Sequence, residues 1–365
     1  MRCFWVAVFV VFFVALASAQ QPQSSEAPKP GAEGPPAAIT APSATSLTNP
    51  DAQLASIHQM IDAGQVSQAI FQLQQMRSEQ PTAHGVTREL ALAYYKTGDY
   101  AHAIPELKRA LDEYGGDKEA TQLLGLALYF TGKPKEAIPH LEAVQSWYPR
   151  ANVDASYVLG LCYIQSLRYE EARKAFATMY DVPPNSAAAH LFNARMLLRQ
   201  GYDPIAEQEA KSAIVADPKL PMAHLLLGEY YLFKSRIPEA VTELKAELAI
   251  NPGHAATYYT LADAYTRLMQ WDDAQRLLQR SIWLDSSASG PYILMGKVLL
   301  HKKDYVLAER TLRRALNMDQ NNYLAHYLLG QTLRATDRAE EAEREMKRSQ
   351  ELQAAQTHGK VEVQQ

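Results

Sequence analysis

Cysteine is scarce in this chain of 365 residues, which contains only Cys3 and Cys162. Two cysteines cannot build the disulfide framework of a small secreted scaffold, and the Cys-x-x-Cys spacing of zinc and redox sites is absent. The motifs His-Glu-x-x-His and Gly-x-Ser-x-Gly are missing too, as is a glycine-rich phosphate-binding loop. We therefore predict that the protein is not an enzyme and holds no metal or cofactor.

A surplus of basic residues is missing as well. The chain has 36 lysines and arginines against 40 aspartates and glutamates, which gives a net charge of −4 at pH 7. Nucleic-acid binding calls for a basic surface, so we expect no nucleic-acid partner. Asn-x-Ser/Thr glycosylation sites are also absent, which favours a bacterial source.

The one long apolar run lies at the N-terminus. Arg2 precedes the run from Cys3 to Leu16, and Ala17-Ser18-Ala19 follows as a small-x-small cleavage site, a pattern typical of a secretory signal peptide. The run is shorter than the roughly 20 residues that a membrane-spanning helix needs. We interpret residues 1–19 as a cleaved signal and expect an exported protein, periplasmic or secreted. The alternative is an uncleaved signal that holds the protein at the inner membrane.

Proline gathers in the segment that follows. Residues 20–49 contain six prolines together with Ala, Ser and Gly, and almost no large apolar side chain. Such a segment cannot bury enough surface to become ordered. We predict a disordered linker over 20–49 and a short disordered tail over 357–365.

Residues 50–356 contain a small residue that returns every 34 positions. The later members of this series are Gly228, Ala262, Gly296 and Gly330. An alanine follows each of them after twelve positions, and a single step, from Gly125 to Gly160, has 35 residues. A fixed period of this length indicates an array of stacked repeats. It divides the chain into nine units: 50–83, 84–117, 118–152, 153–186, 187–220, 221–254, 255–288, 289–322 and 323–356.

The spacing within a unit predicts two helices. From Tyr327 to Leu333 the apolar positions recur at intervals of three and four, as on one face of a helix. A short polar break separates the helices, for example with Gly98 to end one helix and Asp99 to cap the next. A second amphipathic stretch follows, such as Ala101 to Leu111. We therefore predict an all-α protein.

The units resemble the tetratricopeptide repeat, which carries Leu-Gly, Tyr, Ala, a large residue and Pro at set places over 34 residues. Unit 153–186 has these residues as Leu159-Gly160, Tyr163, Ala172, Phe176 and Pro184. Two units depart from the pattern: 50–83 lacks the glycine and the tyrosine, and 187–220 has Ala210 where a large residue is usual. The resemblance implies a right-handed α-solenoid of about nine antiparallel helix pairs, whose first helices line a concave groove that holds a peptide.

The resemblance also indicates which side chains face the groove. Its first part is aromatic, with Tyr95, Tyr129, Phe130 and Tyr157. Its later part alternates in charge, with Arg195, Arg199, Glu229, Phe233, Asp263, Arg267, Lys297, His301 and Arg334. Aromatic side chains exposed in a groove tend to anchor partners, so we predict a protein or peptide seated on the aromatic part and oriented by charge pairing further along. The alternative is a merely solvated inner face. The asparagine of the family's clamp for a terminal carboxylate is missing, which argues against binding of cytosolic chaperone tails.

Histidine and the remaining cysteine have a structural interpretation. His190, His224 and His326 each lie four residues before the small residue of their unit. This shared position favours a repeated packing role over a metal site. Cys162 lies on a mostly apolar helix, and we interpret it as a buried, inert thiol.

The function is therefore expected at the surface of the array. We predict a non-catalytic protein–protein interaction scaffold outside the cytoplasm, acting in cell-envelope assembly, secretion or polysaccharide export. The alternative is a regulatory or substrate-presenting subunit of an envelope enzyme on another chain. Contact with a membrane is expected only through partners or through an uncleaved signal.

Overall fold

The computed structural model describes residues 50–80, 85–148 and 153–362, with side chains as far as residue 356. Within these ranges the chain contains eighteen helices and no strand, which confirms the predicted all-α fold. The predicted signal peptide and linker, over 1–19 and 20–49, lie outside the described residues.

The helices follow one another as nine pairs, each joined by a short turn. They are α1 (Pro50–Asp62) and α2 (Val66–Glu79), α3 (Val86–Lys96) and α4 (Tyr100–Glu113), α5 (Lys118–Phe130) and α6 (Pro134–Trp147), α7 (Val153–Gln165) and α8 (Tyr169–Met179), α9 (Ala187–Arg199) and α10 (Asp203–Ala216), α11 (Ala223–Phe233) and α12 (Ile237–Ile250), α13 (Ala255–Arg267) and α14 (Trp271–Leu284), α15 (Ser289–His301) and α16 (Tyr305–Met318), and α17 (Tyr323–Arg334) and α18 (Ala339–Glu362). The last helix continues into the predicted tail over 357–365, because the residues from Glu351 to Gln356 are mostly strong helix formers and no proline follows them.

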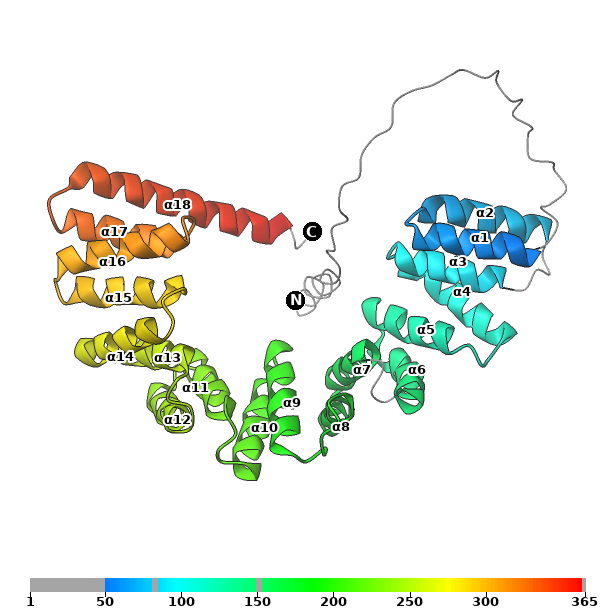
Figure 1. The fold of residues 1–365 in the computed structure, drawn as a ribbon, viewed down its shortest axis with the longest axis horizontal. Helices are drawn as coiled ribbons and strands as arrows, with labels where there is room; N and C mark the ends of the chain where they lie inside the picture. Colours follow the sequence, from blue (N-terminus) through cyan, green and yellow to red (C-terminus); the bar gives the residue numbers. More distant parts are fainter. Residues whose placement is uncertain (1–49, 81–84, 149–152, 363–365) are drawn as a thin grey trace, which may run out of the picture.

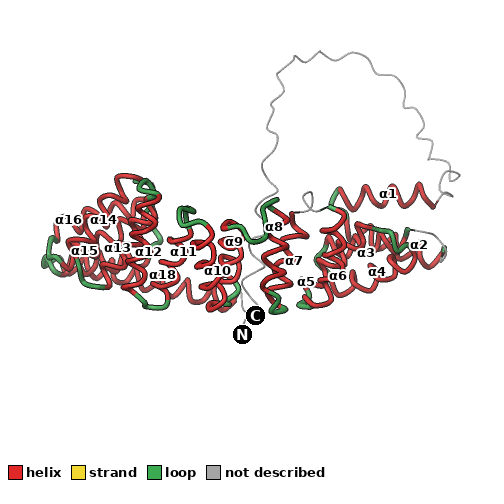
Figure 2. The backbone as a smooth tube through the Cα atoms, turned by 90° about the horizontal axis from the view of Figure 1, so that it is seen from below, coloured by secondary structure: helices red, strands yellow, loops and turns green. Residues whose placement is uncertain are grey.

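The pairs are stacked into a wide arc (Figure 1). The pair α1 and α2 lies at one end of the arc, α17 and α18 lie at the other, and α9 and α10 lie near its midpoint. In the middle of the arc, first helices such as α7 and α11 lie on the inner side, and second helices such as α8 and α12 lie on the outer side. Turned by 90°, the same arc is a narrow band (Figure 2). Each pair packs against the pairs before and after it, which makes the core a continuous row of small local cores.

The turn inside each pair contains one residue in the left-handed backbone conformation. It is a glycine in some pairs, such as Gly98 at φ 76°, and a larger residue in others, such as Leu167 at φ 63°. In the turn after α3, the N–H of Asp99 donates to the carbonyl of Tyr94 at 3.0 Å. The Asp99 carboxylate accepts from the N–H of His102 at 3.2 Å. A single residue thus closes one helix and caps the next.

The small residue of the 34-residue rhythm lies where the two helices of a pair cross. A Cβ at Gly228 would lie 2.7 Å from Leu244 on the partner helix, and a Cβ at Gly160 would overlap the Phe176 ring. Leu244 and Phe176 are fully buried. The glycines therefore let a large side chain of the second helix pack against the backbone of the first.

The fifth unit, 187–220, departs from this packing. Asn193 occupies the place that Leu227 holds in the next unit, and it is fully buried with its Oδ1 lacking a hydrogen-bond partner. Its Nδ2 donates to the carbonyl of Tyr169 at 3.2 Å. Ala210 stands where other units have a large residue. The interfaces of α8 with α9 and of α10 with α11 are also the sparsest between neighbouring units, so the array is least tightly packed here.

Candidate binding groove

The candidate groove is the surface formed by the first helices of the pairs, which in the middle of the arc lie on its inner side (Figure 1). Residues four apart on a helix lie on the same face, so each first helix can present two side chains to this surface. From α3 to α7 these side chains are mostly apolar or aromatic, and from α9 to α17 they are mostly charged. The two parts differ in how far their side chains are exposed.

The aromatic part is more buried than the sequence pattern predicted. Tyr129 is only 7% exposed, so it belongs to the core and is not the groove anchor that its spacing indicated. Burial raises the pKa of the Tyr129 hydroxyl, and Cys162 and Tyr157 of α7 lie near enough to contribute. The neighbouring helix α7 therefore covers the face on which Tyr129 stands. Its buried hydroxyl has no hydrogen bond within the described part of the chain.

Phe130 is the exposed member of the aromatic part. It is 40% exposed, and its ring stacks on Tyr100 with centroids 5.0 Å apart. Tyr95 meets the same Tyr100 edge-on at 5.4 Å, and burial raises the pKa of Tyr95. Tyr157 is half-buried and lies 6.2 Å from the Phe176 ring. The structure thus brings Tyr95 and Phe130 together around Tyr100.

The charged part begins at α9 and is open to solvent. Arg195 and Arg199 of α9 are exposed, as is Glu229 of α11. Burial raises the pKa of Glu229, and the opposite charge of Arg195 counteracts this rise in part. The structure thus leaves these three side chains exposed and brings Arg195 of α9 near Glu229 of α11.

Two further residues join α11 to α13. Arg267 forms an ion pair with Asp263 at 2.8 Å, and its Nη1 donates to the carbonyl of Leu232 at 2.9 Å. Phe233, at the end of α11, is 74% exposed, with the Lys234 ammonium 5.3 Å from its ring centroid. Phe233 is therefore a large, exposed aromatic side chain beside charged groups, and its ring is available to a partner.

The end of the groove contains a hollow of about 620 Å³ between α15, α17 and α18. The predicted residues His301 and Arg334 line it, and His301 also stacks on Trp271 with centroids 4.4 Å apart. Lys297 of α15 is half-buried. The hollow also includes residues that sequence spacing did not select: Leu300, Tyr327, Met346 and Gln350. Met346 and Gln350 belong to a second helix, which the family pattern does not assign to the groove.

Models of the tetratricopeptide repeat match residues 60–127, 131–196 and 293–356, which is more than half of the chain. The chain belongs to the tetratricopeptide repeat family. Repeats of this kind generally serve as non-catalytic scaffolds for protein–protein interaction. A search among curated proteins finds no match.

Three solved structures illustrate the likeness in fold. pilF of Pseudomonas aeruginosa is 19% identical, with 56% of this chain and 97% of that chain covered and a TM-score of 0.45. YrrB, described as a TPR protein with an unusual peptide-binding site, is 19% identical, with 51% and 94% covered and a TM-score of 0.43. MamA is 21% identical, with 45% and 96% covered and a TM-score of 0.42. Likenesses at this level carry no information about function.

The three repeated histidines of this tetratricopeptide array share one contact. His190, His224 and His326 each place Nδ1 at 2.5–2.6 Å from a glutamate on the second helix of the same unit. The shared position in the repeat thus corresponds to a shared His–Glu contact between the two helices of a unit.

Among the described residues, no group of three or more His, Cys, Asp or Glu side chains could hold a metal ion. Cys162 is buried, and burial raises the pKa of its thiol to about 12.

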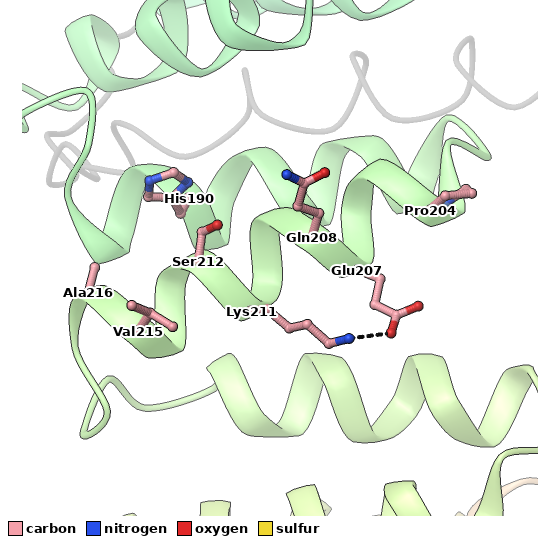
Figure 3. Close-up of a pocket in the computed structure, with 8 residues that line it drawn as sticks. All are labelled: His190, Pro204, Glu207, Gln208, Lys211, Ser212, Val215 and Ala216. Atoms are coloured by element: carbon pink, nitrogen blue, oxygen red, sulfur yellow. Dashed lines mark hydrogen bonds and ion pairs between the residues drawn. The ribbon is translucent and has the colours of Figure 1, made fainter.

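A second hollow, of about 570 Å³, lies away from the first-helix residues of the groove (Figure 3). All but one of the residues that line it belong to α10, the exception being His190 of α9. Lys211 donates to Glu207 at 2.8 Å along its wall. None of the predicted groove residues lines this hollow.

In the part of the chain that the structure describes, no helix is long and apolar enough to cross a membrane.

Proposed function

We propose that this protein is a non-catalytic scaffold that is exported from the cytoplasm and holds a segment of a partner protein along its inner surface. The family supports an interaction role, and the exposed side chains from α9 to α17 support the inner surface as its site. The signal-like residues 1–19 support export. Assembly of the cell envelope, secretion or polysaccharide export is the setting that such an exported scaffold would serve.

The observation that carries this proposal is the exposure of Phe233. A phenylalanine that is 74% exposed costs hydration free energy in the free protein, and burying a full aromatic side chain contributes about 1.5–3 kcal/mol to binding. The Lys234 ammonium lies 5.3 Å from its ring centroid, and Arg267 of α13 donates to the carbonyl of the preceding residue, Leu232. Such an apolar centre with a polar rim is typical of a binding hot spot.

Site-specific crosslinking tests the groove. A photoreactive phenylalanine derivative is placed at Phe233, and as a matched control at Val215, which is 83% exposed on the second helix α10. We expect capture of a distinct protein from the native cell by the Phe233 variant alone, identified by mass spectrometry. Equal capture by both variants, or capture by the Val215 variant alone, would contradict binding at the inner surface.

N-terminal sequencing of the protein from cell fractions tests export. We expect a mature chain that starts near Gln20 and is found outside the cytoplasm. A chain that retains residues 1–19 in the membrane fraction would instead support the anchored alternative. A chain found only in the cytoplasm would contradict export.

A further inference from the structure

The inner surface from α9 to α17 is basic, although the chain as a whole has a net charge of −4. At the groove positions of these helices, five cations stand against two carboxylates. The cations are Arg195, Arg199, Arg267, Lys297 and Arg334, and the carboxylates are Glu229 and Asp263. A local surplus of one charge on a protein of the opposite sign is a feature of surfaces that attract a complementary partner.

Both carboxylates already have a cation of this surface beside them. Asp263 is bound by Arg267 at 2.8 Å, and Glu229 lies within the electrostatic reach of Arg195. Three cations are then left over. Among the described residues, the side chains of Arg199, Lys297 and Arg334 have no hydrogen-bond or ion-pair partner. The charge available to a ligand is therefore positive.

Contacts between helices join parts of this surface, and apolar side chains lie among the cations. The hydrogen bond from Arg267 to the carbonyl of Leu232 joins α13 to α11, and the hollow that includes Arg334 joins α15, α17 and α18. Phe233 lies in the series between Arg199 and Arg267. The surface thus combines positive charge with two apolar positions, the Phe233 ring and the end hollow.

We propose that this surface binds an acidic, extended segment of the partner protein, with carboxylates on Arg199, Lys297 and Arg334 and an apolar side chain on Phe233. The proposal rests on the proposed function of the groove and adds the chemistry of the partner. An extended chain advances about 3.3 Å per residue, so a segment of about twelve residues spans about 40 Å of this surface.

Binding of designed peptides to the full-length mature protein tests this chemistry. Three fluorescent peptides of about twelve residues share a central leucine, and their other positions are rich in glutamate, glutamine or lysine. We expect anisotropy to show binding of the glutamate peptide alone, weakened by added salt because the charges lie at the surface. Binding of the glutamine peptide with equal affinity, or of none of the three, would overturn the proposal.

Matched variants locate the binding surface. Arg199→Gln, Lys297→Gln and Arg334→Gln together should weaken binding of the glutamate peptide by about tenfold or more. The control combines Lys135→Gln, Arg310→Gln and Lys347→Gln, which remove the same charge from exposed positions on α6, α16 and α18. Circular dichroism verifies that both triple variants stay helical. Equal loss in the two triples would show non-specific attraction and would refute the assignment.

Two further outcomes are informative. A DNA oligonucleotide or a vesicle of anionic lipid that binds more tightly than the glutamate peptide, with the same dependence on the groove cations, would overturn the choice of a protein partner. Capture of a partner at Phe233 without binding of the glutamate peptide would overturn the acidic segment and leave the scaffold function intact. The two proposals therefore fail in distinguishable ways.

Discussion

Replacing Gly160 by alanine tests whether the crossing of the two helices depends on the missing side chain. The added Cβ would overlap the Phe176 ring, which is fully buried and confined by the rings of Tyr157 and Phe192. Overpacking of this kind costs about 1–3 kcal/mol, whereas alanine gains about 1 kcal/mol over glycine inside a helix. Because a Cβ at Gly160 would make the closest approach among the described glycines, the cost lies in the upper part of that range, and we expect the free energy of unfolding to fall by about 1–2 kcal/mol.

Gly228→Ala is the matched control. Its Cβ would lie 2.7 Å from Leu244, so the helices must shift slightly. The same chain already pairs an alanine with a leucine at this crossing, Ala262 with Leu278, and both are fully buried. The repeat therefore accommodates alanine opposite leucine, and the helix propensity of alanine offsets the strain. We expect stability to change by less than about 1 kcal/mol.

Urea unfolding followed by circular dichroism measures these changes. Hydrogen exchange of the amides in α7 and α8 supplements it, because an array of repeats need not unfold in one step. Phe176→Leu should recover part of the loss in the Gly160→Ala background, since leucine is the residue that meets alanine in other units. A Gly160→Ala protein as stable as the parent would refute the reasoning. An equal effect of Phe176→Leu in both backgrounds would refute it as well.

Three further predictions concern single residues. Asn193→Leu should raise the free energy of unfolding by only about 1 kcal/mol in urea titrations, because the relief of a buried oxygen that has no partner among the described residues is partly offset by the loss of the hydrogen bond to the Tyr169 carbonyl; a less stable variant would contradict this. In a Cys3→Ser chain, Cys162 should react with a thiol reagent only after unfolding, because burial raises its pKa to about 12; rapid labelling of the folded protein would be inconsistent with this. The hydrogen bond from Lys96 lowers the pKa of Asp62. The stabilisation that this interaction gives the folded protein is therefore present above about pH 4 and is lost as the pH falls through the lowered pKa. In an NMR titration, Lys96→Met should return the Asp62 pKa towards its ordinary value, and an unchanged pKa would count against the tie.

The fold could be predicted because its signal is repeated along the chain. The small residue at the helix crossing, such as Gly228, is fixed by a close approach of the two helices in every unit but the first, where Ile57 stands. Its 34-residue period is therefore kept although other positions of the unit differ. The end of the last helix could not be predicted in this way. The 34-residue period gives no boundary beyond residue 356, and the extent of the helix there depends on helix propensity.

The groove was harder to predict than the fold. The spacing of residues along a helix predicts on which face a side chain lies, but not whether a neighbouring helix covers that face. Tyr129 points from α5 towards α7, and burial by that helix removes it from the surface. The charged side chains from Arg195 onward are mostly exposed in the structure, since long cationic side chains reach solvent even when their stems are covered. Met346 escaped prediction because the family pattern assigns only first helices to the groove, whereas this hollow also includes a residue of the second helix α18.

The sparse interfaces on either side of the fifth unit have a consequence for how the array unfolds. In a linear array, cooperativity is transmitted only through the interfaces between neighbours. The sparse interfaces on both sides of residues 187–220 transmit it least. We therefore expect two blocks, before and after this unit, to melt as separate transitions. A partner that contacts both blocks at once would couple them, so that the bound array unfolds in one transition where the free array unfolds in two.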